Sequence, residues 1–157
     1  MILNSLEVEL YKLADDFISK HEDLGMKATG DWIDSVEVVM NAKGGKILAN
    51  DYTEWLVQGR PPNKNSSEEE IRKWAVGFGS EGGKIYEWAK AKNINISPIA
   101  IAYSIARNGT KSYPEGTDLI DGVHTDQRED EILEAVGESI IQITNKILIR
   151  DLEKMSV

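Results

Sequence analysis

The chain carries the segment Asp51-Tyr-Thr-Glu-Trp-Leu-Val-Gln-Gly-Arg-Pro-Pro62. Asp51 is a favourable helix N-cap, so the segment predicts a short helix that runs through Gln58 and stops at Gly59. The exit through Arg60 is stiff, because the two prolines that follow fix their backbone φ angles. Tryptophan and arginine commonly anchor protein interfaces, so we expect this segment to contact a neighbouring subunit. Its candidate contact residues are Trp55, Gln58, Arg60, Pro61 and Pro62.

A strand hairpin is predicted just before this segment. Residues 32–41 are rich in β-branched side chains, Gly44-Gly45 is a strong turn signal, and residues 46–50 can form the returning strand. Further upstream, residues 2–22 repeat apolar side chains at steps of three and four, which predicts a helix that stops near Gly25.

Several short helices are predicted downstream. Ser67 and Glu70 fit a capping box at the start of a helix that runs to about Val76. We interpret the glycines between 77 and 83 as a flexible linker, followed by a helix over 84–92. Ser97 and Pro98 predict the start of another helix, apolar on most sides and deeply packed. Residues 67–92 are expected to form a helical insertion.

The remainder of the chain combines a long loop with the longest predicted helix. Residues 108–125 are rich in glycine, proline, aspartate and threonine, and loops of this length usually contact partners. The loop's candidate contact residues are Tyr113, Pro114, Leu119 and Ile120. This loop and the loop 59–65 are expected to act as two contact arms.

The predicted last helix covers about 126–155 and carries an apolar stripe. The stripe consists of Leu133, Val136, Ile140, Ile147 and Leu152. We expect the first half of the stripe to be core. The second half is equally compatible with core or with a seam to a neighbouring subunit.

Together these elements predict an α+β fold in a single domain, residues 1–157. A small antiparallel β-sheet is packed by an N-terminal helix and a long C-terminal helix, with extra short helices. A chain of 157 residues is long enough to bury a sizeable core. No apolar run approaches the ~20 residues of a membrane helix, so no membrane partner is expected. The chain has no cysteine, which excludes disulfides and thiolate metal sites.

The net charge of −9 bears on the class of partner. An acidic surface repels phosphate, which disfavours a protein that grips DNA. The same charge suits a conduit through which DNA passes without specific binding.

Catalytic and ligand-binding motifs are weak. The acidic loop residues and histidine that lie close together are Asp118, Asp121, His124 and Asp126. They lack a recognised metal-ligand spacing, and turn formation explains them better. His21 is expected to complement the dipole of the first helix. The glycines at 77, 79 and 82 match a bare dinucleotide pattern without the preceding strand it requires. We therefore predict no catalytic residue, no cofactor and no metal.

The order of these elements resembles the tail-completion (head–tail joining) proteins of tailed bacteriophages. The residues that carry the resemblance are Thr29, Gly30, Ile33, Ser35, Tyr52, Leu56, Gly59, Arg60 and Pro61. The later segment 101–110 resembles an Ala-x-x-Ile-x-x-x-Gly-Thr segment of related phage neck and tail proteins. Arg60 stands where the family commonly has threonine, and Leu119-Ile120 replaces its aromatic-and-proline ending.

The resemblance implies a structural virion protein and not an enzyme. Copies would form a homo-oligomeric ring in the phage neck or upper tail, joining portal or head to tail around the DNA channel. Its partners would be other copies and neighbouring portal, neck or tail proteins. It would be made in the bacterial host cytoplasm and reside in the virion.

Two other classes of protein stay open from the residues alone. One is an acidic adaptor or inhibitor, such as a DNA mimic, that binds a host or phage partner. The other is a hydrolase whose carboxylates form a site without a sequence signature.

Overall fold

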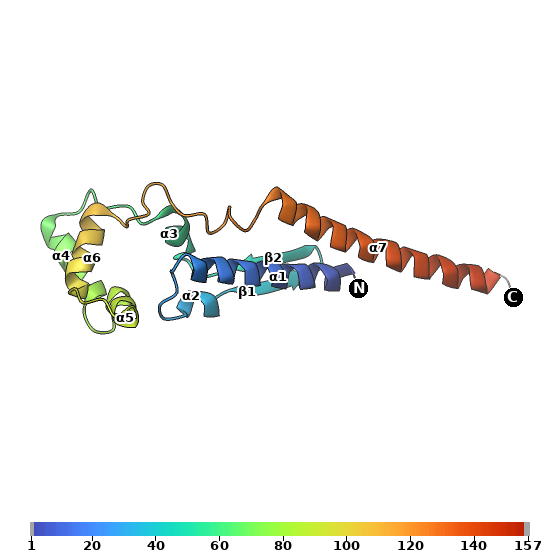
Figure 1. Ribbon diagram of the computed structural model, residues 1–157, viewed down its shortest axis with the longest axis horizontal. Helices are drawn as coiled ribbons and strands as arrows, with labels where there is room; N and C mark the ends of the chain where they lie inside the picture. The colour runs from blue at the N-terminus through green and yellow to red at the C-terminus, as the bar shows by residue number, and fades with distance from the viewer. Residues whose placement is uncertain (1, 156–157) are drawn as a thin grey trace.

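The computed structural model describes the backbone of residues 2–155 and the side chains of residues 4–150. Within that range it combines helices with one two-stranded antiparallel sheet, so the predicted α+β class is confirmed. The elements are α1 (Ile2–Asp23), α2 (Asp31–Asp34), β1 (Glu37–Asn41), β2 (Gly44–Leu48), α3 (Thr53–Gln58), α4 (Glu68–Gly79), α5 (Lys84–Ala91), α6 (Pro98–Asn108) and α7 (Asp126–Met155). The molecule is elongated (Figure 1). We call α1, the hairpin and α7 the stalk, and α4, α5 and α6 the helical lobe.

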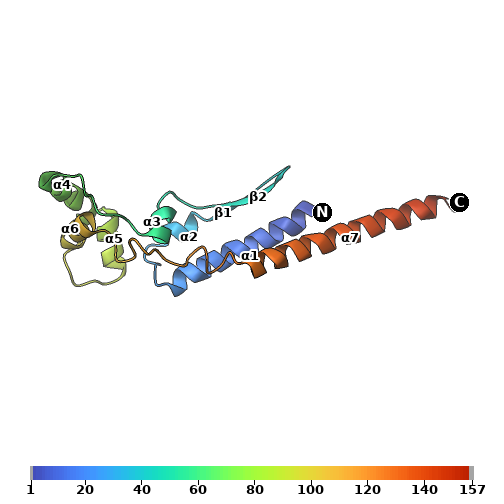
Figure 2. The same cartoon turned by 90° about the horizontal axis from the view of Figure 1, so that it is seen from above.

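The stalk is organised around α1, which contacts both strands and α7. The hairpin and α7 lie on different sides of α1 (Figures 1 and 2). The strands pair in a register that runs from Glu37 opposite Leu48 to Asn41 opposite Gly44. Leu13 and Ala14 of α1 are buried. The predicted amphipathic helix therefore contributes residues to the core.

The predicted first strand was too long at its beginning. Residues 31–34 form the single helical turn α2, which buries the Trp32 side chain. The Ser35 hydroxyl stabilises this turn, since it donates to the Trp32 carbonyl (2.6 Å) and accepts from the Asn50 amide (3.1 Å). The hairpin turn also lies earlier than predicted, because the Asn41 side chain accepts from the Lys43 amide and Gly44 already belongs to β2. Local side-chain hydrogen bonds thus override the β-branched pattern.

The helical lobe packs through small residues. Ser67 and Glu70 form the predicted capping box at the start of α4. The helix continues past Val76 to Gly79, so the interpretation of Gly77 and Gly79 as linker residues was wrong. A Cβ on Gly79 would lie 2.5 Å from the Ile99 Cα atom, which shows how closely α4 and α6 approach each other. The buried alanines of this contact are Ala75, Ala102 and Ala106.

The helix after β2 begins differently from the prediction. Tyr52 occupies the N-cap of α3 without a side-chain hydrogen bond, so Asp51 does not cap the helix. The Thr53 side chain stabilises the start of α3 instead. Its hydroxyl donates to the Asn50 carbonyl (2.6 Å) and accepts from the Trp32 indole nitrogen (2.9 Å). This hydrogen bond ties α3 to α2.

Helix α7 has the predicted bounds but not the predicted burial. None of its described residues is buried, and Leu133 is 69% exposed. The expectation that the first half of the stripe is core was therefore wrong. Helix α7 packs against α1 and extends beyond it (Figures 1 and 2). None of the helices in the described part of the chain has the length and apolar character that a bilayer span requires.

Candidate functional site

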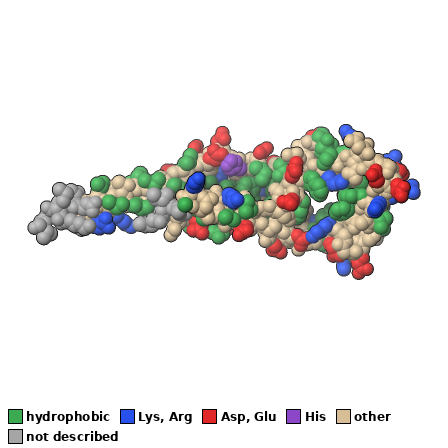
Figure 3. Space-filling view, turned by 180° about the vertical axis from the view of Figure 1, so that it is seen from behind, with side chains coloured by type: hydrophobic (Ala, Val, Ile, Leu, Met, Phe, Trp, Pro, Cys, Tyr) green, Lys and Arg blue, Asp and Glu red, His purple; other side chains and the backbone are tan. Residues whose placement is uncertain are grey.

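A pocket of about 490 Å³ lies between the stalk and the helical lobe. One wall comes from the end of α1, from α2 and from α3, and the other comes from α4, α5 and α6. All four tryptophans of the chain line it, namely Trp32, Trp55, Trp74 and Trp88. Figure 3 shows the hollow between the stalk and the helical lobe, which is bordered by hydrophobic and basic side chains. Its size and aromatic lining are typical of a binding site.

The Arg60 side chain lies across two of these rings. Its guanidinium carbon is 5.5 Å from the Trp55 ring centroid and 4.2 Å from the Trp74 ring centroid. One guanidinium nitrogen donates to the Asn63 side-chain oxygen (2.8 Å), while Nε is buried without a hydrogen-bond partner. Burial lowers the pKa of Arg60 from its ordinary value. Arginine keeps its positive charge in proteins nevertheless, so the pocket holds a partly desolvated cation.

Backbone pairing fixes the position of Arg60. Its amide donates to the Thr110 hydroxyl (2.8 Å), and its carbonyl accepts from the Thr110 amide (2.9 Å). Gly59 has φ 77° and ψ 154°, and Gly109 has φ 81° and ψ −178°, in a region that essentially only glycine populates. The segments 59–61 and 109–110, which carry part of the phage resemblance, are therefore two halves of one joint.

His21 and Trp32 form the floor of the pocket on the stalk side. Their rings stack with centroids 4.4 Å apart, and both side chains are only 3% exposed. Burial is the largest cause that lowers the pKa of His21 below its ordinary 6.5. A charged His21 is thus disfavoured, and its expected role of complementing the helix dipole was wrong. His21 serves as an aromatic packing residue.

Two lysines, Lys84 at the start of α5 and Lys92 just after its end, contact residues on the stalk side of the pocket. Lys84 forms an ion pair with Asp31 (2.8 Å), and Lys92 donates to the Gly25 carbonyl (2.7 Å). Hydrogen bonding between Lys84 and Asp31 raises the pKa of the lysine and lowers that of the aspartate. The side chains of Lys84 and Asp31 are both exposed, so their ion pair is not a large source of stability. We regard the contacts of the two lysines as positioning the helical lobe relative to the stalk.

The predicted contact residues divide into three groups. Trp55 and Arg60 are brought together at the pocket, with Trp55 47% exposed. The residues on or near the surface around the joint are Gln58, Pro61, Pro62, Tyr113, Pro114 and Ile120. Leu119 is fully buried, so it belongs to the core of this protomer and offers no surface to a partner. An interface role for the exposed residues stays a prediction.

The two loops are not free arms. Gly59 lies so close to the 112–113 backbone that an added Cβ would be 2.5 Å from the Tyr113 amide nitrogen. Thr117 donates its amide to the Val57 carbonyl (2.6 Å) and its hydroxyl to the Leu56 carbonyl (2.8 Å). The loop 108–125 is therefore fastened along α3. The expectation that the two loops act as two separate contact arms was therefore wrong.

The pocket residues that the sequence analysis did not identify are those whose partners lie far along the chain. Trp74, Phe78 and Trp88 line the pocket, but the sequence analysis does not single them out. Trp74 and Phe78 stack with ring centroids 4.4 Å apart, one helical turn from each other. Only the uneven placement of aromatic residues in short amphipathic helices could have pointed to them.

The polar groups of the pocket are suited to binding. Asp31 is paired with Lys84, and His21 stacks on Trp32, so these groups are not arranged as a nucleophile and its base. Elsewhere, Asp118 pairs with Lys20 (2.5 Å) and His124 pairs with Glu129 (3.0 Å). No cluster of three or more potential metal ligands is found among the described residues.

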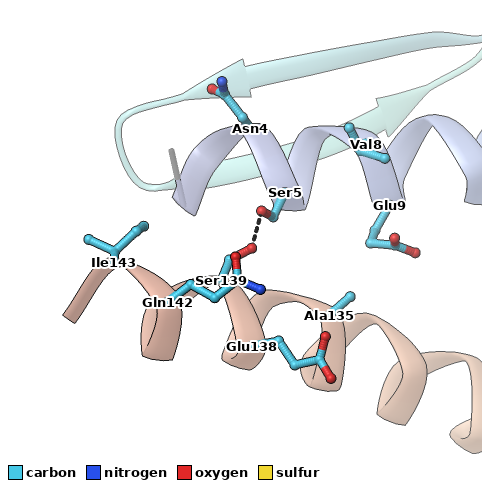
Figure 4. Close-up of a pocket in the computed structure, with 9 residues that line it drawn as sticks. All are labelled: Asn4, Ser5, Val8, Glu9, Ala135, Glu138, Ser139, Gln142 and Ile143. Atoms are coloured by element: carbon cyan, nitrogen blue, oxygen red, sulfur yellow. Dashed lines mark hydrogen bonds between the residues drawn. The ribbon is translucent and has the colours of Figure 1, made fainter. Parts of the chain in front are cut away.

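A second hollow, of about 420 Å³, lies between α1 and α7 (Figure 4). The Ser5 and Ser139 hydroxyls share a hydrogen bond across it. Near its end, the Arg128 guanidinium lies 3.2 Å from an Asp16 oxygen, 3.1 Å from a Glu131 oxygen and 3.7 Å from a Glu9 oxygen. Polar contacts thus provide much of the link between α7 and α1, and the apolar side chains of α7 remain available.

Comparison with known proteins gives no relative for this chain. No protein-family model, no curated protein and no solved structure matches it.

Proposed function

We propose that this chain is a structural subunit of an oligomeric ring in the neck or upper tail of a tailed bacteriophage. The ring would join the portal or head to the tail around the DNA channel. The observation that carries the proposal is the exposed apolar surface of α7. Its large apolar side chains are 44% to 69% exposed in the described part of the chain.

The size of this surface argues for a protein neighbour. The exposed apolar residues of α7 are Leu133, Ile140, Ile141, Ile147, Leu148 and Ile149. A helix of 30 residues at ~1.5 Å per residue is about 45 Å long, and these side chains are spread along half of it. Figure 3 shows hydrophobic side chains along the described part of the narrow end of the molecule. Large exposed apolar patches mark interaction sites in soluble proteins.

The chemistry of the surface supports a second copy as that neighbour. The same α7 carries acidic residues towards its start and isoleucines towards its end, so it presents two different surfaces to its surroundings. Contacts between two different surfaces of identical chains generate rings when the rotation closes. The net charge of −9 would keep DNA phosphates from adhering to such a ring.

The joint between 59–61 and 109–110 supports the phage assignment. The short motifs shared with tail-completion proteins fall far apart in the sequence, yet Arg60 and Thr110 pair directly. Thr29 and Gly30, from the first motif, line the same pocket as Arg60. A shared architecture in which these motifs meet is what a real family relationship would require.

The mass of the purified full-length chain tests the proposal. Light scattering over a range of concentrations is expected to give one discrete assembly of several 17.5 kDa chains. Ile141→Asp places a charge on the exposed apolar surface and is expected to dissociate the assembly while leaving the helix content unchanged. Ile141→Leu, which keeps an apolar side chain at the same exposed position, is the matched control and should assemble normally. A wild-type chain that is monomeric at every concentration would refute the proposal.

A further inference from the structure

Arg60 is a pocket cation that has no acidic partner among residues 4–150. Its contacts within the described residues are the Asn63 amide oxygen, the Pro61 carbonyl and the two tryptophan rings. The chain has 27 acidic residues against 18 basic ones, so an arginine held away from every carboxylate is unusual here. Partly buried charges are normally paired, because desolvation without a counter-charge is costly. The pocket is therefore complementary to a carboxylate that comes from outside the protomer.

The pocket surrounds this cation with apolar surface. The side chains of Trp55, Trp88 and Ile85 line it beside Arg60, and Trp55 and Trp88 are 47% and 37% exposed. A ligand group that fits must combine a carboxylate with an apolar side chain of moderate size. A protruding leucine next to an aspartate satisfies both requirements.

The first turns of α7 present such a group. Leu133 has the highest exposed fraction, 69%, of the large apolar side chains in the described residues. Asp130 precedes it by three positions, so both lie on the same face of the helix. The Asp130 side chain has no ion pair or hydrogen bond among the described residues. Gly137 follows on that face with open space around it, which leaves Leu133 protruding.

We infer that the aromatic pocket of one copy receives Leu133 of the next copy, with Asp130 paired to Arg60. The inference rests on the proposed ring and identifies its head-to-tail contact. One copy supplies the protruding helix, and its neighbour supplies the pocket. Because the two surfaces are different, each copy in a closed ring uses both of them.

Charge reversal in the full-length chain tests this pairing. The concentration at which half of the chains are assembled is measured by light scattering for wild type, Arg60→Glu, Asp130→Lys and the double variant. Each single reversal brings like charges together and is expected to raise that concentration about tenfold or more. The double variant restores opposite charges and should return to within about threefold of wild type. Asp15 is an exposed aspartate on α1 whose side chain has no ion pair among the described residues, so Asp15→Lys is the matched control and should leave this concentration unchanged.

Tryptophan emission supplies a second readout, because every tryptophan of the chain lines this pocket. Filling the pocket with a leucine removes water from Trp55 and Trp88, so the emission maximum should shift to shorter wavelength as wild type assembles. Leu133→Asp should abolish the shift. Leu133 is exposed, so the variant should keep the helix content and the thermal transition of the wild-type monomer.

The possible outcomes separate this inference from the proposed function. A wild-type chain that assembles, with assembly and emission unaffected by Arg60→Glu and Asp130→Lys, overturns the inference and leaves the ring intact. If Arg60→Glu keeps the helix content and thermal transition of the wild-type monomer, weakening by Arg60→Glu without rescue in the double variant also overturns the inference, since the pocket then receives another group. A wild-type chain that never assembles overturns both.

Discussion

The guanidinium carbon of Arg60 lies 4.2 Å from the centroid of the Trp74 ring. Arg60 follows the end of α3, and Trp74 lies in the middle of α4, so this contact connects the segment next to the stalk with the helical lobe. Both residues line the pocket. The contact gives Arg60 a role inside the protomer in addition to the role we propose for it between protomers.

Substitution of Arg60 should therefore affect stability as well as assembly. Arg60→Ala removes both ring contacts, and partly desolvated cation–π pairs contribute about 1–2 kcal/mol. We expect a folded monomer whose free energy of unfolding is lower by about that amount. Arg60→Lys keeps the charge but loses the flat stacking surface. Its free energy of unfolding should lie between those of wild type and Arg60→Ala. Urea unfolding, at a protein concentration where the chain is monomeric, measures the free energy of unfolding of each variant. An Arg60→Ala variant as stable as wild type would show that the ring contacts contribute nothing.

Two glycines of the chain should respond in opposite directions to alanine. Gly59→Ala places a Cβ at φ 77°, 2.5 Å from the Tyr113 amide nitrogen, and should destabilise the fold by about 1–3 kcal/mol. Gly77→Ala lies inside α4 with no atom near its Cβ, and should stabilise by about 0.5–1 kcal/mol. Thermal unfolding of both variants checks the sign. Equal effects would contradict the positions given to these two residues.

The loop 108–125 should contain both core and surface residues. Leu119→Ala removes a fully buried side chain and should cost about 2–5 kcal/mol. Tyr113→Ala, in the same loop but 37% exposed, should cost much less. Denaturant unfolding of the two variants compares them directly. If Leu119→Ala were neutral, the loop would not be packed as described.

The stability of the protein should depend on His21 between neutral and mildly acidic pH. Burial lowers the pKa of His21 in the folded chain below 6.5, so the unfolded chain binds this proton more readily. Stability that is present above pH 6.5 is therefore lost as the pH falls towards the lower pKa of the folded state. His21→Phe keeps a ring against Trp32 and removes the titration. The difference in unfolding free energy, wild type minus His21→Phe, should decrease from pH 7 to pH 5. A constant difference would contradict a buried neutral His21.

What could be predicted from the sequence was largely local. The capping box of Ser67 and Glu70, the bounds of α7 and the α+β class follow from neighbours within a few positions. The placement of Trp32 could not be predicted, because it depends on hydrogen bonds from Ser35 and Thr53 that compete with strand formation. The burial of α7 was overestimated for a related reason, since an apolar stripe has the same pattern whether its partner is the protomer or a neighbour.

The pocket itself lay beyond sequence reasoning for a physical reason. Its walls come from segments that range from His21 to Ser112, and no local pattern encodes their meeting. Trp55 and Arg60 were nevertheless selected from the sequence, because tryptophan and arginine next to a proline exit are typical of contact sites. Their third partner, Trp74, required the fold.

Electron microscopy of the purified full-length chain is the most direct test of the proposed ring. The account predicts closed rings of uniform size with a central opening. Single 17.5 kDa particles at all concentrations, or open filaments in place of closed rings, would contradict it.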